Sequence, residues 1–115
     1  MEVEYYEKPD GSCPVEEFIL NQDKKMQAKI LRMITLLERF GNNLRESYSK
    51  HLSDGIFELR AQVGNNATRT LYFFLGQDKA ILTNGFVKKT QRTPLKEILT
   101  AKKRRQDHQR KNRSA

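Results

Sequence analysis

Apolar and polar residues alternate along the middle of the chain, in a pattern that is typical of half-buried β-strands. In residues 56–63 the odd-numbered positions from 57 onward are apolar, whereas Glu58, Arg60 and Gln62 are polar. Successive side chains of a strand point to opposite faces of its sheet. We therefore expect one face of this strand to be buried and Arg60 to lie on the other face.

Two further strands follow in the sequence. Residues 68–75 are almost continuously apolar after Arg69, as expected for a central strand that is covered on both faces. Residues 80–87 form the third predicted strand. The Gly-Asn pair at 64–65 favours a two-residue hairpin turn between the first two strands, and a second turn falls within 76–78.

Helical spacing dominates the first part of the chain. A short strand is predicted over Val3–Tyr6, and Pro14 fits the first position of a helix over Val15–Asn21. A second helix, Asp23–Phe40, is predicted from apolar residues that recur three or four positions apart. We expect this apolar stripe to pack against the sheet; it consists of Met26, Ile30, Met33, Ile34, Leu37 and Phe40.

The remaining segments complete the predicted fold. Gly41 favours a helix stop, and Asn42–Lys50 reads as a polar connection. A last helix is expected from Leu95 to about Gln106, with Ile98 and Leu99 facing inward. The chain is thus expected to be one α+β domain over 1–115, in which an N-terminal strand and two helices pack on an antiparallel sheet and a C-terminal helix follows.

Composition limits where and how this protein works. The chain has 115 residues, enough for one small domain. It contains no apolar run long enough to span a membrane, and its acidic N-terminus lacks the apolar core of a secretory signal. With Cys13 as the only cysteine, no internal disulfide is possible. We therefore expect a cytoplasmic protein without a membrane partner.

The positive charge is concentrated at the C-terminus. Residues 102–113 contain seven basic residues and one acid, a net charge of +6, which leaves +2 of the total of +8 for the rest. From about 102 this tail is expected either to be a solvated, flexible end or to act as a basic arm that contacts nucleic-acid phosphates.

Strand register predicts a cationic site. If Gly64 and Asn65 form the loop, Arg60 lies opposite Arg69. Two arginines directly opposed destabilise a sheet, and an anion held between them would relieve that repulsion. Because guanidinium groups bind phosphate through paired hydrogen bonds, these two are candidates for holding a phosphate. The alternative is that Arg60 pairs with Glu58 on a solvated face.

The third strand adds two residues to this face. If its loop is Gln77-Asp78, Phe86 lies opposite Arg69 and Lys88 shares the same face, although a one-residue change of loop would reverse this assignment. Lys88 would add charge or exchange a proton, and the Phe86 ring would stack on a base. Lys89 alternates to the opposite face and is a weaker candidate.

Other polar residues near these strands are secondary candidates. His51, beside Lys50, would act as a general acid or base or be an ordinary surface histidine. Glu58 would orient Arg60 or act as a base, and we favour the first role. His108 is expected to be solvated and Tyr72 to belong to the core. The sequence has no metal-ligand spacing, glycine-rich phosphate loop or hydrolase triad, so we expect neither a metal nor another cofactor.

Three segments, in this order, resemble the RelE/ParE toxin superfamily, and most closely its HigB-like, phage-related host-inhibition branch. They are residues 52–60 (LSDGIFELR), 69–74 (RTLYFF) and 85–94 (GFVKKTQRTP). Ala101 and the basic pair at 103–104 also fit, and the resemblance is strongest over 52–104. The order of predicted elements agrees with the fold of that superfamily.

The resemblance implies the toxin of a type II toxin–antitoxin system. Such toxins typically cleave mRNA on translating ribosomes without a metal. HigB-like toxins usually pair with a HigA-like antitoxin that carries a helix-turn-helix domain, so that operator DNA is contacted only through the antitoxin. Two other classes stay open: a ParE-like toxin that inhibits DNA gyrase, and a non-catalytic module that binds RNA or the ribosome.

Overall fold

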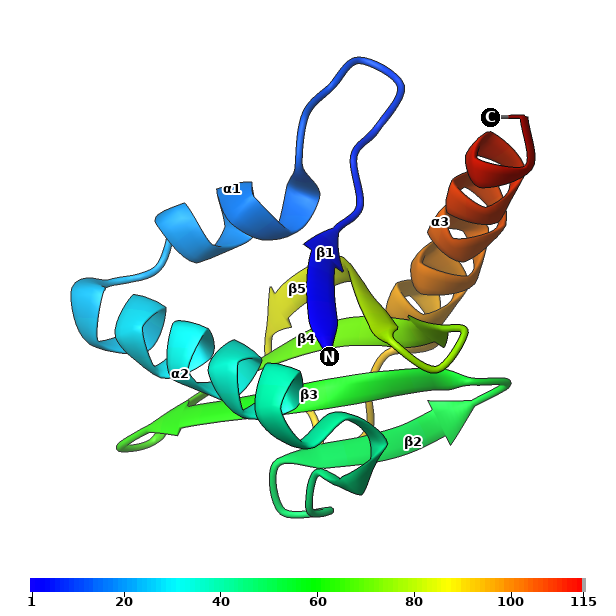
Figure 1. Cartoon of the computed structure of the whole chain (residues 1–115). Helices are drawn as coiled ribbons and strands as arrows, with labels where there is room; N and C mark the ends of the chain where they lie inside the picture. The colour runs from blue at the N-terminus through cyan, green and yellow to red at the C-terminus, as the bar shows by residue number, and fades with distance from the viewer. Residues whose placement is uncertain (115) are drawn as a thin grey trace.

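Five strands form one sheet, with two helices on one face and a third helix on the other (Figure 1). The structure, a computed structural model, describes residues 1–114 and their side chains as far as Asn112. Its elements are β1 (Glu2–Tyr5), α1 (Pro14–Leu20), α2 (Lys24–Phe40), a 3₁₀ turn (Gly41–Asn43), β2 (Ser49–Ser53), β3 (Ile56–Val63), β4 (Asn66–Leu75), β5 (Lys79–Val87) and α3 (Leu95–Ser114).

The predicted α+β fold is confirmed, with a mixed rather than an antiparallel sheet. The strand order is β1-β5-β4-β3-β2. β1 runs parallel to β5, and the other neighbours are antiparallel. β4 occupies the centre, and its residues 68–73 are all buried, as its continuous apolar pattern predicted. None of the helices in the described residues is long and apolar enough to cross a membrane.

α2 has the boundaries that its sequence predicted. The Asp23 carboxylate caps its start by accepting a hydrogen bond from the Met26 amide at 2.8 Å. Gly41 ends it with a φ of +56°, a left-handed conformation that suits glycine. Five residues of the predicted apolar stripe are buried. The sixth, Phe40, is 46% exposed, so this part of the prediction is wrong.

β2 was missed, because the segment Asn42–Lys50 reads as a polar connection. The strand pairs with β3 through a two-residue turn in which both Asp54 and Gly55 have positive φ, 49° and 77°. Asp-Gly is a strong hairpin signal in sequences, and this pair was the signal from which the strand could have been predicted. The strand lies at the sheet edge and alternates weakly, with exposed Lys50 and His51.

The sheet has a different core on each face. On one face, α1 and α2 cover apolar residues of β3, β4 and β5, with Leu37, Tyr72 and Leu82 almost fully buried. On the other face a smaller cluster contains Phe73 and Ala101, the latter from α3. This smaller cluster covers only part of the sheet face, so the even-numbered side chains of β3 from Glu58 onward lie on the face that it leaves polar.

α3 is longer than predicted, since it continues past Gln106 to Ser114. Leu99 was expected to face inward but is 54% exposed, so this prediction is wrong, whereas Ile98 is half-buried. Ala101 has no exposed surface. The last predicted basic residue of the tail, Arg113, has its side chain outside the described part of the structure.

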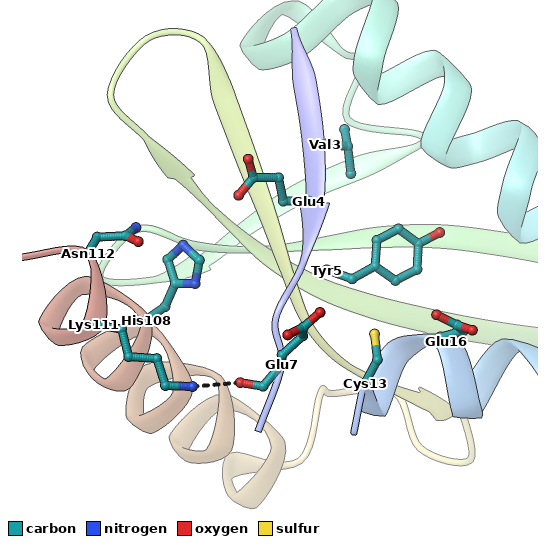
Figure 2. Close-up of a pocket in the computed structure, with 9 residues that line it drawn as sticks. All are labelled: Val3, Glu4, Tyr5, Glu7, Cys13, Glu16, His108, Lys111 and Asn112. Atoms are coloured by element: carbon teal, nitrogen blue, oxygen red, sulfur yellow. Dashed lines mark hydrogen bonds between the residues drawn. The ribbon is translucent and has the colours of Figure 1, made fainter. Parts of the chain in front are cut away.

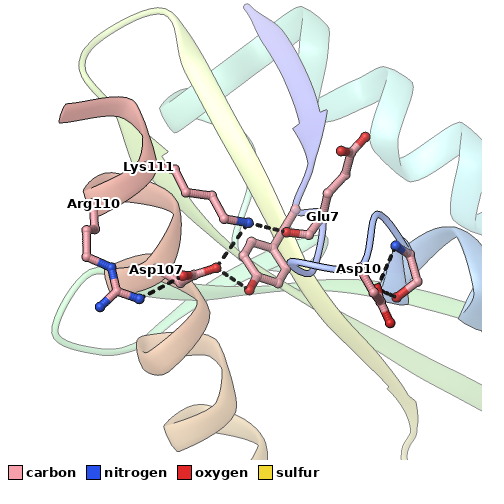
Figure 3. Close-up of polar contacts among 7 residues, drawn as sticks. Glu7, Asp10, Asp107, Arg110 and Lys111 are labelled. Atoms are coloured by element: carbon pink, nitrogen blue, oxygen red, sulfur yellow. Dashed lines mark hydrogen bonds and ion pairs between the residues drawn. The ribbon is translucent and has the colours of Figure 1, made fainter. Parts of the chain in front are cut away.

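Polar contacts attach the second half of α3 to the segment after β1 (Figure 3). The Tyr6 hydroxyl donates a hydrogen bond to the Asp107 carboxylate at 2.6 Å. The Lys111 ammonium donates to the Glu7 carbonyl at 2.9 Å and lies 3.2 Å from Asp107. The hydrogen bond from Tyr6, a contact with Arg110 at 3.0 Å and the one with Lys111 lower the pKa of Asp107 to about 2. The Tyr6 and Lys111 contacts attach the part of α3 beyond residue 102 to the rest of the protein. The expectation of a solvated, flexible tail is therefore wrong for the residues that form them.

His108 is half-buried on α3, against the sheet, so the prediction of a solvated side chain is only partly correct. Its ring centroid is 6.0 Å from that of Phe73, and its Nε2 atom is buried without a hydrogen-bond partner among the described residues. Burial lowers the pKa of His108, and Lys111 and Lys79 add to this shift against the opposing influence of Glu4.

The His108 environment predicts a pH-dependent stability. The folded state disfavours the imidazolium form of His108. As the pH falls through the ordinary histidine pKa of about 6.5, the unfolded chain therefore binds a proton at this residue before the folded protein does. The free energy of unfolding of the wild type should therefore decrease between pH 7.5 and 5.5 more steeply than that of His108→Leu. Urea unfolding at both pH values measures the two slopes, and equal slopes would contradict this assignment.

Gly85 allows α1 to lie against β5. A Cβ atom at this position would be 2.4 Å from Cδ2 of Phe18, which is closer than side chains tolerate. We expect Gly85→Ala to lower the free energy of unfolding by about 1–3 kcal/mol, the usual cost of overpacking. The same change in a Phe18→Ala background should cost clearly less in urea unfolding. An equal cost in both backgrounds would show that the Phe18 contact is not the cause.

Candidate functional site

The predicted pairing of the two arginines is confirmed. Arg60 of β3 lies opposite Arg69 of β4, and Arg69 lies opposite Phe86 of β5. Lys88 follows on the same face, one residue past the end of β5, and its amide donates to the Ala67 carbonyl at 2.9 Å. The face expected to carry these cations is therefore the one on which α3 packs.

The pairing of β4 with β5 was predicted correctly at Arg69 and Phe86, although the loop between these strands is longer than the one assumed. Leu75 pairs with Lys79, so the turn contains three residues and not two. An irregularity follows, because Leu71 pairs with Asn84 whereas Tyr72 pairs with Leu82. This leaves Thr83 as an extra residue in β5, a bulge that restores the parity beyond it.

Glu58 occupies the space between the two arginines. Its Oε2 atom lies 3.0 Å from Nε and 3.0 Å from Nη2 of Arg60, and 3.6 Å from Nε of Arg69. The alternative pairing of Arg60 with Glu58 is therefore present. This internal carboxylate supplies the anion that two opposed arginines require, and the three groups together keep a net charge of +1.

The two arginines differ in their access to solvent. The Arg69 side chain is only 8% exposed, and its Nη1 donates to the Thr68 carbonyl at 3.0 Å. Burial lowers the pKa of Arg69, while Glu58 opposes that shift. The Arg60 side chain is 31% exposed. The Arg60 guanidinium is therefore accessible to an anion from solvent, whereas Arg69 contributes positive charge from below the surface.

The loop after β5 folds back onto this cluster. Thr93 donates a hydrogen bond from its hydroxyl to Oε1 of Glu58 at 2.5 Å. Both carboxylate oxygens of Glu58 are thus engaged, one by Thr93 and the other by the arginines, an arrangement suited to orienting Arg60. Thr93 was not singled out as a site residue, although it lies in the motif at 85–94.

A cavity of about 240 Å³ opens beside Arg60. Lys50 lines it from β2, where this residue lies opposite Glu58, two residues from Arg60 along β3. Arg92 lines it from the loop after β5 and is a further cation that the sequence did not single out. Three cationic side chains on a shallow cavity, with a fixed carboxylate behind them, can hold a phosphodiester.

The remaining predicted residues are not all brought to this cavity. Lys88 and Lys89 line a separate hollow of about 390 Å³ with Gln62 and Ala67. Phe86 is partly buried against the smaller core cluster. The site therefore divides into an Arg60 cavity, over β2 and the middle of β3, and a neighbouring lysine hollow, beside the end of β3 and the residues that follow β5.

The His51 ring lies on the opposite face of the sheet, although the residue contributes to the lining of the Arg60 cavity. Its ring centroid is 5.0 Å from that of Phe57, and its Nε2 accepts a hydrogen bond from the Gly55 amide at 3.1 Å. This atom therefore has an acceptor role in the hairpin turn. The geometry favours a structural role for His51 over proton transfer in the cavity.

A larger cavity of about 570 Å³ lies at the other edge of the sheet. Figure 2 shows Cys13 and Glu16 of the α1 region on one side of β1, and His108 and Lys111 of α3 on the other. Glu4, Glu7 and Glu16 are among its lining residues. Three carboxylates repel a phosphate backbone, so charge and not size places the candidate site at Arg60.

The comparison with known families covers most of the chain. The family model described as "Phage derived protein Gp49-like (DUF891)" matches residues 17–106. The match includes β2 to β5 and all the cations of the candidate site, and it omits β1 and the end of α3. No curated protein matches the chain.

Proposed function

Since the chain belongs to the Gp49-like family of phage-derived proteins, which is a RelE-like toxin family of toxin–antitoxin systems, we propose that it is a toxin that cleaves mRNA on the ribosome. The observation that carries this proposal is the Arg60 guanidinium, fixed by the buried Glu58 and partly exposed in a cavity that Lys50 and Arg92 also line. Such a cavity favours a phosphodiester substrate.

The proposed reaction is attack by the ribose 2′-oxygen on the adjacent phosphorus. A base takes the 2′-hydroxyl proton, the bond to the 5′-oxygen breaks, and that oxygen leaves with a proton from an acid. The products are a 2′,3′-cyclic phosphate and a 5′-hydroxyl. Arg60 neutralises the charge that develops on the phosphorane oxygens, a role comparable to that of an oxyanion donor.

The other residues have supporting roles in this proposal. Glu58 and Thr93 keep the Arg60 side chain in place, and Arg69 supplies charge from below the surface. The lysine hollow, with Lys88 and Lys89, binds the next phosphates of the message. Phe86, which lies opposite Arg69, is the proposed stacking partner for a base. As a HigB-like toxin, the protein would act in the cytoplasm and be neutralised by a HigA-like helix-turn-helix antitoxin, which alone contacts operator DNA.

Primer extension on an mRNA in a purified translation system tests this function. We expect new 5′ ends when the protein is added, and none on the same message without ribosomes. An intact message with translation still running would overturn the proposal, and a DNA gyrase supercoiling assay would then test the ParE-like alternative. Translation arrest on an uncut message would identify a binding module.

A further inference from the structure

An apolar groove lies between the second half of α2 and the segment that leads into β2. Its volume is about 340 Å³, within the range of small ligand pockets. Leu36 and Leu44 are partly buried in its floor, while Phe40 and Tyr48 are 46% and 39% exposed. Large aromatic side chains exposed together around a concave surface are typical of binding sites.

Two arginines flank this groove. Arg32 precedes Leu36 by one helical turn on α2, and Arg45 follows Leu44 in the segment before β2. Both are exposed, and neither forms an ion pair with a carboxylate of the described residues. Apolar walls with free guanidinium groups at the edge are complementary to an apolar side chain with neighbouring carboxylates.

The groove is separate from the candidate phosphate site. Leu36 and Leu44 pack against the core on the α2 face of the sheet, whereas Arg60 and Glu58 lie on the α3 face. The groove also adjoins β2, an edge strand that, among the described residues, pairs with β3 alone. The outward backbone groups of an edge strand can accept a further strand.

We propose that this groove binds an acidic segment of a partner protein, with one bulky apolar side chain seated between α2 and the 44–48 segment. The carboxylates of that segment pair with Arg32 and Arg45, and its backbone continues along the free edge of β2. A protein segment suits the site better than RNA, because branched aliphatic residues form the floor and the phosphate-binding cations lie on the other face. The inference goes beyond the proposed cleavage and holds equally for a protein without catalysis.

Backbone amide NMR shifts of the full chain test this proposal. The probes are three capped hexapeptides, Glu-Asp-Leu-Phe-Glu-Asp, Lys-Lys-Leu-Phe-Lys-Lys and Glu-Asp-Ala-Ala-Glu-Asp, and an oligouridylate of ten nucleotides. We expect the first peptide alone to shift the amides of residues 36–50. Oligouridylate that shifts these same amides would replace the proposal with a nucleic-acid surface.

Charge reversal separates a specific site from general attraction. Arg45→Glu should weaken binding of the Glu-Asp-Leu-Phe-Glu-Asp peptide at least tenfold. Lys25→Glu is the matched control, because it reverses an exposed charge at the other end of α2 and should leave the affinity unchanged. Equal losses in the two variants, equal binding of the lysine peptide, or no localised shift with any peptide would each overturn the proposal.

Discussion

Replacing Arg60 with alanine should reduce cleavage of ribosome-bound mRNA by about 100-fold or more, the usual effect of losing one donor to a developing oxyanion. The loss should come without unfolding, because the side chain is 31% exposed and its guanidinium contacts the Glu58 carboxylate at the edge of the cluster. The cleavage rate in a purified translation system measures the first effect, and urea unfolding measures the second.

Lys25→Ala is the matched control for this prediction. Lys25 is an exposed cation near the start of α2, a helix that covers the opposite face of the sheet. The control should change the cleavage rate far less than Arg60→Ala does. Similar rates for wild type and Arg60→Ala would remove Arg60 from the reaction and with it the proposed site.

Among the substitutions considered, Glu58→Ala should lower the free energy of unfolding the most. The Glu58 side chain is 5% exposed, and its removal leaves the Arg69 guanidinium, 8% exposed, without its carboxylate. Breaking a buried charge pair in this way typically costs about 3–5 kcal/mol. Small proteins unfold with only about 5–15 kcal/mol, so urea unfolding should show a marked shift of the midpoint.

A double replacement tests whether this cost comes from the unpaired charge. Glu58→Leu combined with Arg69→Met removes both buried charges and keeps apolar volume in their place. It should be more stable than the sum of the two single changes predicts, because the pair interacts. Strict additivity, or a cost below about 1 kcal/mol for Glu58→Ala, would contradict the coupled arrangement of these groups.

The elements with a strong period were predictable from the sequence. β3 has the predicted bounds because its alternation is unbroken and Gly64-Asn65 ends it with a recognised turn. α2 follows its apolar stripe, as far as the last residue, Phe40. This residue is exposed because Gly41 ends the helix, and the chain then turns away into the 3₁₀ turn and leaves the ring beside a groove.

Other features depended on contacts that a local pattern does not contain. The turn after β4 was predicted one residue too short, and only the bulge at Thr83 kept Phe86 opposite Arg69. β2 is an edge strand with too little alternation to be found except through its Asp-Gly turn. The length of α3 depends on partners almost the whole chain away, such as Tyr6 for Asp107.

The candidate site shows both cases. The proximity of Arg60 and Glu58 could be predicted because they are two residues apart on one strand. The proximity of Arg60 and Arg69 could be predicted from the strand register. The bond from Thr93 could not, because it requires the loop after β5 to fold back onto Glu58. The burial of Arg69 could not be predicted either, because it depends on tertiary packing. A sequence pattern therefore located Arg60 and Arg69, while the structure added Arg92 and showed that Arg60 is the more exposed of the two predicted arginines.

The chemistry of the cut ends tests the central claim most directly. Wild-type protein should leave a 2′,3′-cyclic phosphate on the upstream fragment of ribosome-bound mRNA and a 5′-hydroxyl on the downstream fragment, as attack by the 2′-oxygen requires. Ligation methods specific for each type of end distinguish these products. Fragments with 5′-phosphate ends, or a message that stays whole on the ribosome, would contradict the account.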